Sequence, residues 1–402
     1  MTGFDAEVII VGGGPAGSVT AALLAERGRH VLILDKARFP RHKACSEYVN
    51  PAGARLLADL GLEGELAALG AHRVEGMLIH APGGHRFLAD FDAAAPGLHA
   101  LGLSRIRLDA LLLDRAAAAG AAVYDRAHVR DLIVEDGAVR GVRAAVRGSQ
   151  ETIRAPLIVG ADGHHGVVSR ALGLDVHPRW PRRTGFVAHY RGVTGLDRWG
   201  EMHVARHGYA GMAPLENGLT NVAFVAASDA VAARQESVED FFTIGLSAIP
   251  EVAAKLVGAE RVGSIRGVGP MSRRARRVVG DGYLLAGDAA SFLDPFTGEG
   301  VSEALRGAML AAPVIDAALR SGDVSARSLA PYRAERRRAF AAKRQVAWLV
   351  QAFIDNPGLM DYATARLASR DREASTLAGV LGGLSPAGHA LSPRFLARLL
   401  RP

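Results

Sequence analysis

The first residues with a clear chemical use are three glycines near the N-terminus, spaced G-x-G-x-x-G: Gly12, Gly14 and Gly17. They follow the apolar run EVIIV and open an apolar segment that Gly28 ends. In such a motif the first glycine permits a tight turn, the second lets the backbone approach a diphosphate, and the third lets a helix pack against a strand. The pattern predicts a strand, a dinucleotide-binding turn and a helix.

Asp35 supports this interpretation. It ends a second apolar run, HVLILDK, and a carboxylate there can accept hydrogen bonds from an adenosine ribose. The helix that follows the glycines offers free N–H groups and a partial positive charge to a diphosphate. Pro15, Ala16 and Lys36 belong to the same predicted binding set. The spacing alone does not choose between FAD and NAD.

A second motif favours FAD. The segment GDAASFLDPFTGEG begins with Gly287 and Asp288 after an apolar run, so Asp288 is expected to bind a ribitol hydroxyl. Pro295, Gly298 and Gly300 lie in the turn that leads into the next predicted helix. The N-terminus of that helix can face the pyrimidine end of an isoalloxazine ring and stabilise the negative charge of the reduced ring. An ordinary NAD dehydrogenase has no need of this second helix terminus.

Taken together, five segments resemble the FAD-dependent oxidoreductase superfamily with the p-hydroxybenzoate-hydroxylase fold, and within it the geranylgeranyl-reductase-like branch. They span roughly residues 5–310 and form a specific set: VGGGPAG at 11–17, FPRHKACSEYVNPAG at 39–53, RIRLDALL at 105–112, LIVGADG at 157–163 and LAGDAASFLDPFTGEG at 285–300.

This resemblance implies roles for further residues. Arg105 is expected near the FAD diphosphate or ribityl chain. Asp162 and Gly163 form the family's second aspartate–glycine motif, which contacts FAD. One departure is visible, because Gly166 stands where the family usually has a serine.

Three positions are predicted to act in catalysis: Cys45, Glu47 and Pro295. In the resembling branch a cysteine lies close to the flavin, whereas a free cysteine elsewhere is more often a buried small hydrophobe. Glu47 and His42 flank it and can transfer protons, or can be ordinary hydrogen-bonding residues. Strand alternation does not decide whether His189 points into a substrate cavity.

The expected fold class is α/β (α+β), with a Rossmann-like FAD-binding domain, an inserted antiparallel substrate-binding sheet and a C-terminal helical segment. The FAD-binding domain is expected to be discontinuous, at residues 1–75, 101–180 and 265–330. Residues 76–100 and 181–264 are expected to form the substrate sheet, and residues 331–402 the C-terminal helices.

Composition narrows the partners. The net charge of +7 comes from scattered arginines, densest between residues 333 and 344, without the aromatic-interleaved pattern of nucleic-acid binding. Cys45 is the only cysteine, which excludes an intramolecular disulfide. The histidines show no HExxH-type spacing, so no metal site is predicted. No signal peptide or membrane span is read, so we expect a cytoplasmic protein with a small-molecule substrate. The tail LSPRFLARLLRP is expected to pack against the body rather than touch a membrane. Oligomeric state is open.

The reaction type rests on the segment GYAGMAPLENG, residues 208–218. Prenyl reductases of the family carry Tyr-x-Trp-x-Phe-Pro there. Here Tyr209 and Pro214 are present, but Gly211 and Ala213 replace the two aromatic residues. Smaller residues suggest a roomier pocket, so we predict a monooxygenase of an apolar or aromatic secondary metabolite, with electrons from NAD(P)H or a separate donor. The alternatives are a C=C reductase, a halogenase-like enzyme and a non-catalytic flavin-binding protein. This chain lacks the Trp-x-Trp-x-Ile-Pro segment of the flavin halogenases.

Overall fold

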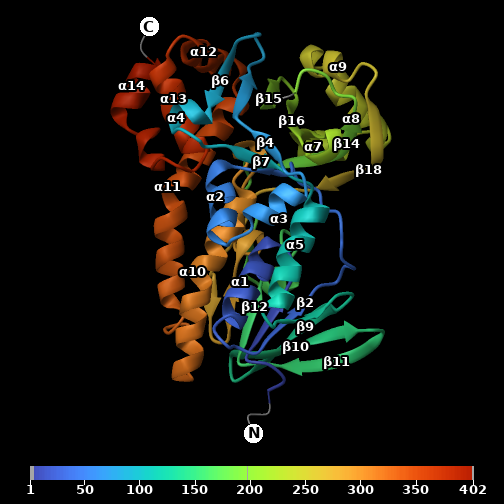
Figure 1. The fold of residues 1–402 in the computed structure, drawn as a ribbon, viewed down its shortest axis with the longest axis vertical. Helices are drawn as coiled ribbons and strands as arrows, with labels where there is room; N and C mark the ends of the chain where they lie inside the picture. The colour runs from blue at the N-terminus through green and yellow to red at the C-terminus, as the bar shows by residue number, and fades with distance from the viewer. Residues whose placement is uncertain (1–3, 197, 401–402) are drawn as a thin grey trace.

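The computed structural model describes residues 4–196 and 198–400. Its lower half in Figure 1 is built on a six-stranded sheet of order β20-β21-β12-β1-β2-β8, parallel except for the terminal β20. The strands are β1 (Val8–Val11), β2 (Val31–Leu34), β8 (Ala122–Tyr124), β12 (Leu157–Gly160), β20 (Val279–Gly280) and β21 (Tyr283–Leu285). The predicted strand, turn and helix at the N-terminus are present.

Successive side chains of β1 point to opposite faces of this sheet, and both faces are buried. Val8 and Ile10 pack with the helices α1 (Pro15–Ala25), α5 (Arg105–Ala118) and α10 (Gly300–Ser321). Ile9 and Val11 pack against a three-stranded sheet. That sheet contains β9 (His128–Glu135), β10 (Ala138–Val146) and β11 (Ser149–Arg154). A parallel sheet buried on both faces explains why its strands read as continuous apolar runs.

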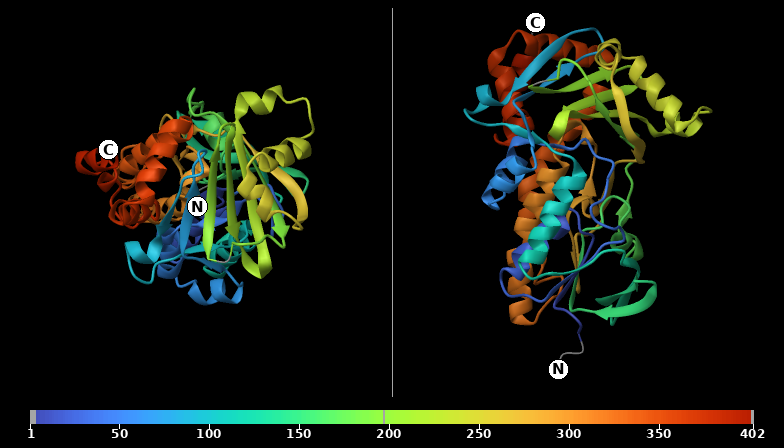
Figure 2. Two further views of the ribbon diagram at one scale, coloured as in Figure 1. Left: turned by 90° about the horizontal axis from the view of Figure 1, so that it is seen from above. Right: turned by 45° about the vertical axis from the view of Figure 1, so that its right-hand side comes forward.

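The upper half contains a seven-stranded sheet of order β18-β14-β17-β16-β15-β5-β6 (Figure 2). Its strands are β5 (Gly76–His80), β6 (Arg86–Asp90), β14 (Arg183–Arg191), β15 (Trp199–Ala205), β16 (Gly208–Pro214), β17 (Leu219–Ala227) and β18 (Glu260–Val268). We expected an antiparallel sheet, but β5 and β15 pair in parallel. The reason is the chain connectivity. Strands β5 and β6 belong to an earlier chain segment, and β5 pairs with β15, the last strand of the group formed by the later segment.

Several short elements connect these sheets. A small sheet of order β3-β7-β4 contains β3 (Tyr48–Val49), β4 (His72–Val74) and β7 (Ala100–Gly102). Another, of order β13-β19-β22, contains β13 (Asp175–Val176), β19 (Arg273–Ala275) and β22 (Ser291–Phe292). The remaining helices before the C-terminal segment are α2 (Pro51–Asp59), α3 (Glu63–Ala68), α4 (Phe91–Ala94), α6 (Val167–Ala171), α7 (Ser228–Ala233), α8 (Val238–Ser247) and α9 (Pro250–Lys255).

The chain ends in α11 (Ala330–Ile354), α12 (Pro357–Ala368), α13 (Asp371–Leu381) and α14 (Pro393–Leu400). The long α11 runs along one side of both halves, and α12–α14 gather beside the upper sheet (Figure 1). Phe395 and Leu399 are buried in the same core as β5 and β6, so the expected packing of the tail is confirmed for its described part; residues 401–402 lie outside it. Among the described residues, no helix is both long and apolar enough to cross a membrane.

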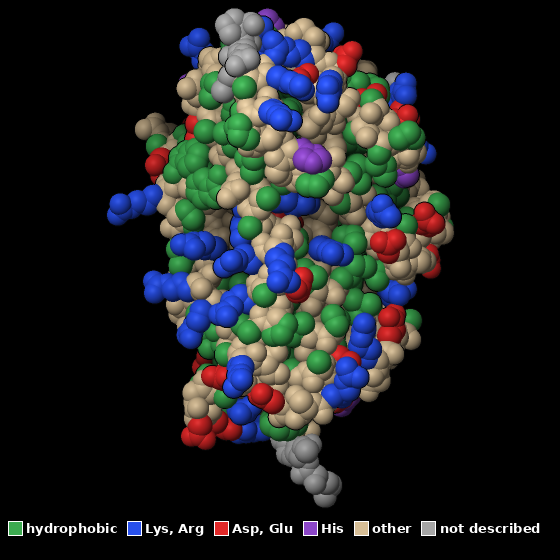
Figure 3. All heavy atoms as spheres, turned by 90° about the vertical axis from the view of Figure 1, so that its left-hand side faces the viewer, with side chains coloured by type: hydrophobic (Ala, Val, Ile, Leu, Met, Phe, Trp, Pro, Cys, Tyr) green, Lys and Arg blue, Asp and Glu red, His purple; other side chains and the backbone are tan. Residues whose placement is uncertain are grey.

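The basic run of the sequence lies on α11. This helix contributes the exposed side chains of Arg333, Arg337 and Arg338. Lys and Arg side chains gather across the middle of the face seen in Figure 3, which is the side of the molecule that α11 follows. The run is therefore part of an amphipathic helix whose other side packs on the protein.

The predicted domain limits remain a prediction, with one visible conflict. Strand β18 continues to Val268 as part of the seven-stranded sheet, so a boundary at residue 265 would cut through it. Charged and small residues in β18 weaken its apolar alternation, which is why the sequence pattern placed its end too early.

Candidate functional site: an FAD-binding cleft beside an apolar cavity

The glycine-rich turn follows β1 and is closed too tightly for side chains at two positions. Gly12 has φ +103°, and a Cβ there would lie 2.5 Å from the backbone oxygen of Ala161. A Cβ at Gly17 would lie 1.9 Å from the oxygen of Gly12. The first and third glycines therefore let turn, helix and strand meet, as the motif requires.

Gly14 differs, because it faces open space. A Cβ there would have only two neighbours, the guanidinium groups of Arg41 at 3.6 Å and Arg105 at 4.0 Å. Among the described residues, no side chain caps the N-terminus of α1 and no acidic residue lies in its first turn, where Pro15 and Ala16 are buried. Free N–H groups and two cations fit a diphosphate. Arg41 was missed from the sequence; its only signal is the basic stretch RHK.

Asp35 holds the turn in place. Its Oδ2 accepts a hydrogen bond from the N–H of Gly13 at 2.8 Å, and its Oδ1 accepts one from the N–H of Ala37 at 2.8 Å. Each oxygen keeps a lone pair for a ribose hydroxyl. The neighbouring Lys36 is exposed, and its role in binding stays a prediction.

Arg105 lies at the start of α5 and is buried. Its guanidinium makes two hydrogen bonds to Asp109, of 2.6 and 2.8 Å, and Asp109 also pairs with Arg41 at 3.2 Å. The buried Asp109 therefore fixes both guanidinium groups beside Gly14.

The second FAD motif meets the first one directly. Gly287 has φ +58°, and a Cβ there would lie 3.0 Å from the Cβ of Ala16. Asp288 follows in a short 3-10 turn, with its carboxylate partly exposed and 3.9 Å from the Nζ of Lys43. This position, beside the N-terminus of α1, fits a carboxylate that binds the chain between diphosphate and ring.

Asp162 and Gly163 follow β12 at the same edge of the sheet. The Oδ2 of Asp162 accepts the N–H of Val168 at 3.1 Å, so this carboxylate caps α6, while its buried Oδ1 has no partner among the described residues. Burial raises the pKa of Asp162. A Cβ at Gly166 would lie 2.3 Å from Oδ1, which explains the missing serine: the carboxylate occupies its space.

The turn before α10 joins the cleft to a cavity. Gly298 has φ +64°, and a Cβ there would lie 2.6 Å from the ring of Tyr48. Pro295 and Gly298 line the cavity, and Gly300 begins α10 with open space around it. The predicted helix terminus is therefore accessible to a planar ligand lying between the two halves.

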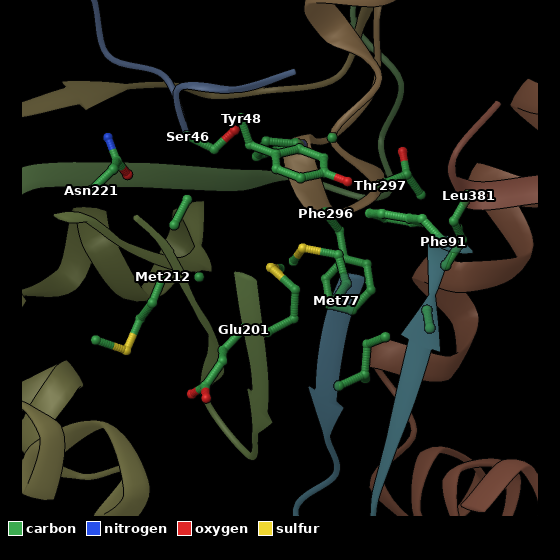
Figure 4. Close-up of a pocket in the computed structure, with 17 residues that line it drawn as sticks. Ser46, Tyr48, Met77, Phe91, Glu201, Met212, Asn221, Phe296, Thr297 and Leu381 are labelled. Carbon is green, nitrogen blue, oxygen red and sulfur yellow. The ribbon is translucent and has the colours of Figure 1, made fainter. Parts of the chain in front are cut away.

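The cavity lies between this turn and the inner face of the seven-stranded sheet (Figure 4). Most of its lining is apolar, including Met77, Met202 and Phe296; Leu381, at the end of α13, closes one side. The carboxylate of Glu201 points away from Tyr48 and Phe296, toward the opposite face of the sheet.

Gly211 and Ala213 both line the cavity, but the cavity is small rather than roomy. Its free volume is about 50 Å³. A Cβ at Gly211 would lie 3.1 Å from the sulfur of Met202, its cross-strand partner. Flexible methionine side chains fill the room that the small residues leave, and they can move for a ligand.

Glu47 is the most constrained polar residue beside the cavity. It is 2% exposed and has φ +56°, a left-handed conformation that non-glycine residues seldom adopt. Its Oε1 accepts the N–H of Arg105 at 2.8 Å, and its Oε2 accepts the side-chain amide of Asn221 at 3.0 Å and also contacts Nε2 of His189. Three distant segments thus hold one carboxylate.

Cys45 belongs to this group but does not reach the cavity wall. Its sulfur accepts the N–H of Glu47 at 3.4 Å, and its carbonyl accepts the amide of Asn221 at 2.9 Å. Ser46 and Asn221 line the cavity, whereas Cys45 and Glu47 lie behind them. His42 is exposed, with its ring 6.1 Å from that of His189. His189 itself is buried on the inner face.

A third polar group lies on the outer face of the same sheet. His80, Glu201 and His203 each offer a ligand atom, and these atoms lie within 4.8 Å of one another. The sequence predicted no metal site, because more than a hundred residues separate His80 from the other two and no local spacing reveals the group.

Comparison with known proteins decides the family. The family described as FAD binding domain matches residues 5–347, most of the chain. The chain belongs to this FAD-binding family. The predicted superfamily, FAD-dependent oxidoreductases with the p-hydroxybenzoate-hydroxylase-like fold, is thereby confirmed, and so is FAD as the cofactor that this family binds.

Relatives within this superfamily carry out different reactions. Digeranylgeranylglycerophospholipid reductase 1 of Methanopyrus kandleri is 31% identical over 85% of this chain and 89% of that protein. Menaquinone reductase of Mycolicibacterium smegmatis is 30% identical over 77% of this chain and 76% of that protein. The solved structure of the myxobacterial chondrochloren halogenase is 26% identical, with a TM-score of 0.81 over 98% of this chain and 92% of that one. The family therefore indicates an FAD-dependent enzyme without fixing its reaction.

Proposed function

We propose that this oxidoreductase reduces a carbon–carbon double bond in a slender apolar substrate. The observation that carries the proposal is the cavity, which is small, is lined largely by apolar and methionine side chains, and reaches the turn before α10. A substrate with few polar groups loses little hydration on entering such a space. The relatives that reduce menaquinone and a digeranylgeranyl phospholipid support this substrate class.

Reduction of a double bond consumes two electrons and two protons. FAD, when bound and reduced, would supply the electron pair together with one of the two protons. This chain must then supply or relay a proton to the substrate carbon, and Glu47, His189 and Asn221 form a polar group that reaches the cavity through Asn221. We assign proton storage to the Glu47–His189 pair. Asn221 lines the cavity and donates to the Glu47 carboxylate, so it lies between the pair and the substrate.

Oxygen insertion is the second candidate, and the small residues Gly211 and Ala213 favour it. Both line the cavity where the prenyl reductases of the branch carry aromatic side chains. Movement of Met202 would open a broader space there, suited to a ring system. For either reaction we infer NAD(P)H as the electron source, used directly or through a separate donor protein.

Product analysis distinguishes the reactions. The FAD-loaded enzyme is reduced chemically in the absence of oxygen and mixed with a quinone or phospholipid that carries a geranylgeranyl chain. The masses of the products are then measured by mass spectrometry. We expect a gain of two hydrogens. Parallel reactions use ¹⁸O₂ with NADPH and a polycyclic phenol, with and without bromide. Incorporation of oxygen-18 or bromine, with no hydrogenated product in the first reaction, would overturn the reductase proposal.

A variant pair ties the result to the cavity. Gly211→Leu places a side chain against Met202 inside the cavity, so we expect at least about tenfold lower turnover with FAD binding unchanged. Ser264→Leu is the control, because Ser264 is exposed on β18 of the same sheet. Equal turnover of the two variants would place the substrate elsewhere.

A further inference from the structure

Three polar side chains cluster on the outer face of the seven-stranded sheet, behind the wall of the apolar cavity. Glu201 and His203 are two residues apart on β15, so they point to the same face. The parallel register places His80 of β5 directly beside His203. Their rings stack, with centroids 4.1 Å apart and planes 16° apart. The strands therefore fix the three side chains as one group.

The group is closed off from solvent. The exposed fractions are 8% for His80, 3% for Glu201 and 1% for His203. Glu201 Oε2 lies 2.8 Å from His203 Nε2. His80 Nε2 and His203 Nδ1 are both buried and have no hydrogen-bond partner among the described residues. Buried polar atoms are normally satisfied, so two orphan nitrogens in one cluster require an explanation.

A purely structural role explains only part of this arrangement. It accounts for the His203–Glu201 contact and for the pairing of Glu201 with Lys255 at 3.2 Å. It gives no reason for a second buried histidine whose ring nitrogen has nothing to bind, where an apolar residue would avoid the cost of an unpaired polar atom. Both orphan atoms are, however, the kind of atom that coordinates a transition metal.

We propose that His80, Glu201 and His203 form a binding site for a divalent transition metal of the zinc type. The site supplies one nitrogen from each histidine and one oxygen from Glu201. Two imidazoles and one carboxylate suit zinc or iron(II) better than magnesium or calcium, which prefer oxygen ligands. The candidate atoms already lie within 4.8 Å of one another, and closure around one ion would require the rings to rotate toward it.

Helix α9 covers the site and supplies the charges that control it. Lys255 bonds Glu201 and the carbonyl of Gly195, and its side chain is 21% exposed, so it can turn toward solvent when a cation enters. Glu251, one helical turn earlier, is exposed and interacts electrostatically with His80. Exchange of a lysine for a divalent ion leaves one additional positive charge, which Glu251, close enough to interact electrostatically with His80, can offset.

The role of such an ion follows from the topology. It would clamp β5 to β15 at the single parallel pairing of the sheet, where two separate chain segments join. His80 and His203 do not line the cavity, whereas Glu201 does, with its carboxylate pointing away from Tyr48 and Phe296. The ion would therefore steady the substrate-binding wall from its outer side.

Zinc content tests the site. FAD-loaded protein is stripped with a chelator, dialysed against micromolar zinc and measured by mass spectrometry of the metal. We expect one zinc ion per chain in the unaltered protein. His80→Phe keeps a ring stacked on His203 but removes the ligand nitrogen, so we expect zinc content to fall close to zero with retained FAD absorbance. His207→Phe, at an exposed histidine in the turn between β15 and β16, is the matched control and should retain the zinc.

Lys255→Ala gives an independent result. It removes the cation that competes for Glu201, so we expect tighter zinc binding, by about tenfold or more. If Glu201 and Lys255 were only a structural pair, this variant would lose stability and gain no zinc affinity. An unaltered protein without bound zinc, or equal zinc content in the His80→Phe and His207→Phe proteins, would overturn the proposal.

Discussion

At the scale of single residues, the site depends on groups that are held by contacts from distant parts of the chain. Glu47 keeps a left-handed backbone because Arg105, Asn221 and His189 all bind its carboxylate. A strained conformation persists only where surrounding contacts determine it, and such positions concentrate at functional sites. The geometry thus supports Glu47, rather than Cys45, as the polar group to test first.

Replacement of Glu47 by Gln should separate proton transfer from cofactor binding. Gln has the same shape and can accept the N–H of Arg105, but it does not store a proton. We expect turnover at saturating FAD to fall about 10²-fold, with FAD affinity nearly unchanged. Turnover and flavin binding by fluorescence titration measure this. A Glu47→Asp protein should recover part of the activity; full activity in Glu47→Gln would remove the residue from the mechanism.

Gly14 and Gly17 should respond differently to substitution. Gly14→Val keeps an extended backbone, with φ −80°, and has space for its side chain, so we expect a folded protein. That side chain occupies the place of the diphosphate, so FAD affinity should fall at least about tenfold. Gly17→Ala, whose Cβ would lie 1.9 Å from the Gly12 oxygen, should instead lower thermal stability. Full FAD occupancy after dialysis of Gly14→Val would show that the diphosphate lies elsewhere.

At the scale of elements, α10 and α11 enclose the carboxyl group of Glu303, and burial there disfavours its charged form. Burial raises the pKa of Glu303, in the first turn of α10, from 4.5 to about 7, and the nearby Glu299 adds to the shift. The folded protein therefore holds this proton more tightly than the unfolded chain. The stability linked to it is fully present below about pH 4.5 and is lost as pH rises through about 7.

Replacement of Glu303 by Gln removes this pH-dependent loss. Relative to the unaltered protein, the variant should gain at least about 1 kcal/mol at pH 8 compared with pH 5, which for a chain of this length is roughly 1 °C or more in melting temperature. Thermal unfolding of the FAD-loaded proteins at both pH values measures it. Glu335→Gln on the surface of α11, where Glu335 pairs with Arg338 at 2.6 Å, is the control. The same difference between variant and parent at both pH values would contradict the assigned pKa.

Elements with local signals could be predicted from the sequence. Residue type and spacing over a few positions are enough to recognise the glycine turn, Asp35 and the Asp288 segment. The parallel pairing of β5 with β15 could not be read, because strand pairing between distant segments leaves no local pattern. For the same reason Arg41 and the His80–Glu201–His203 group were missed, although each residue was visible in the sequence.

At the scale of the whole molecule, the cavity forms only when separate segments come together. Its walls come from the segment after Cys45, from β5 and β6, from β15–β17, from the turn before α10 and from the end of α13. Sequence patterns predicted most of these elements, but not that methionines would fill the space left by Gly211. The packing of side chains from neighbouring strands determines the size of the cavity, and this packing is known only once the three-dimensional structure is known.

One wall of this cavity lies outside the segment that matches the FAD-binding family. Leu381 belongs to helices beyond residue 347, where the match to the FAD-binding family ends. A substitution at Leu381 therefore changes the cavity wall at a position that is not part of the nucleotide-binding turn. Redesign of substrate specificity could begin there and leave the flavin-binding motifs as they are.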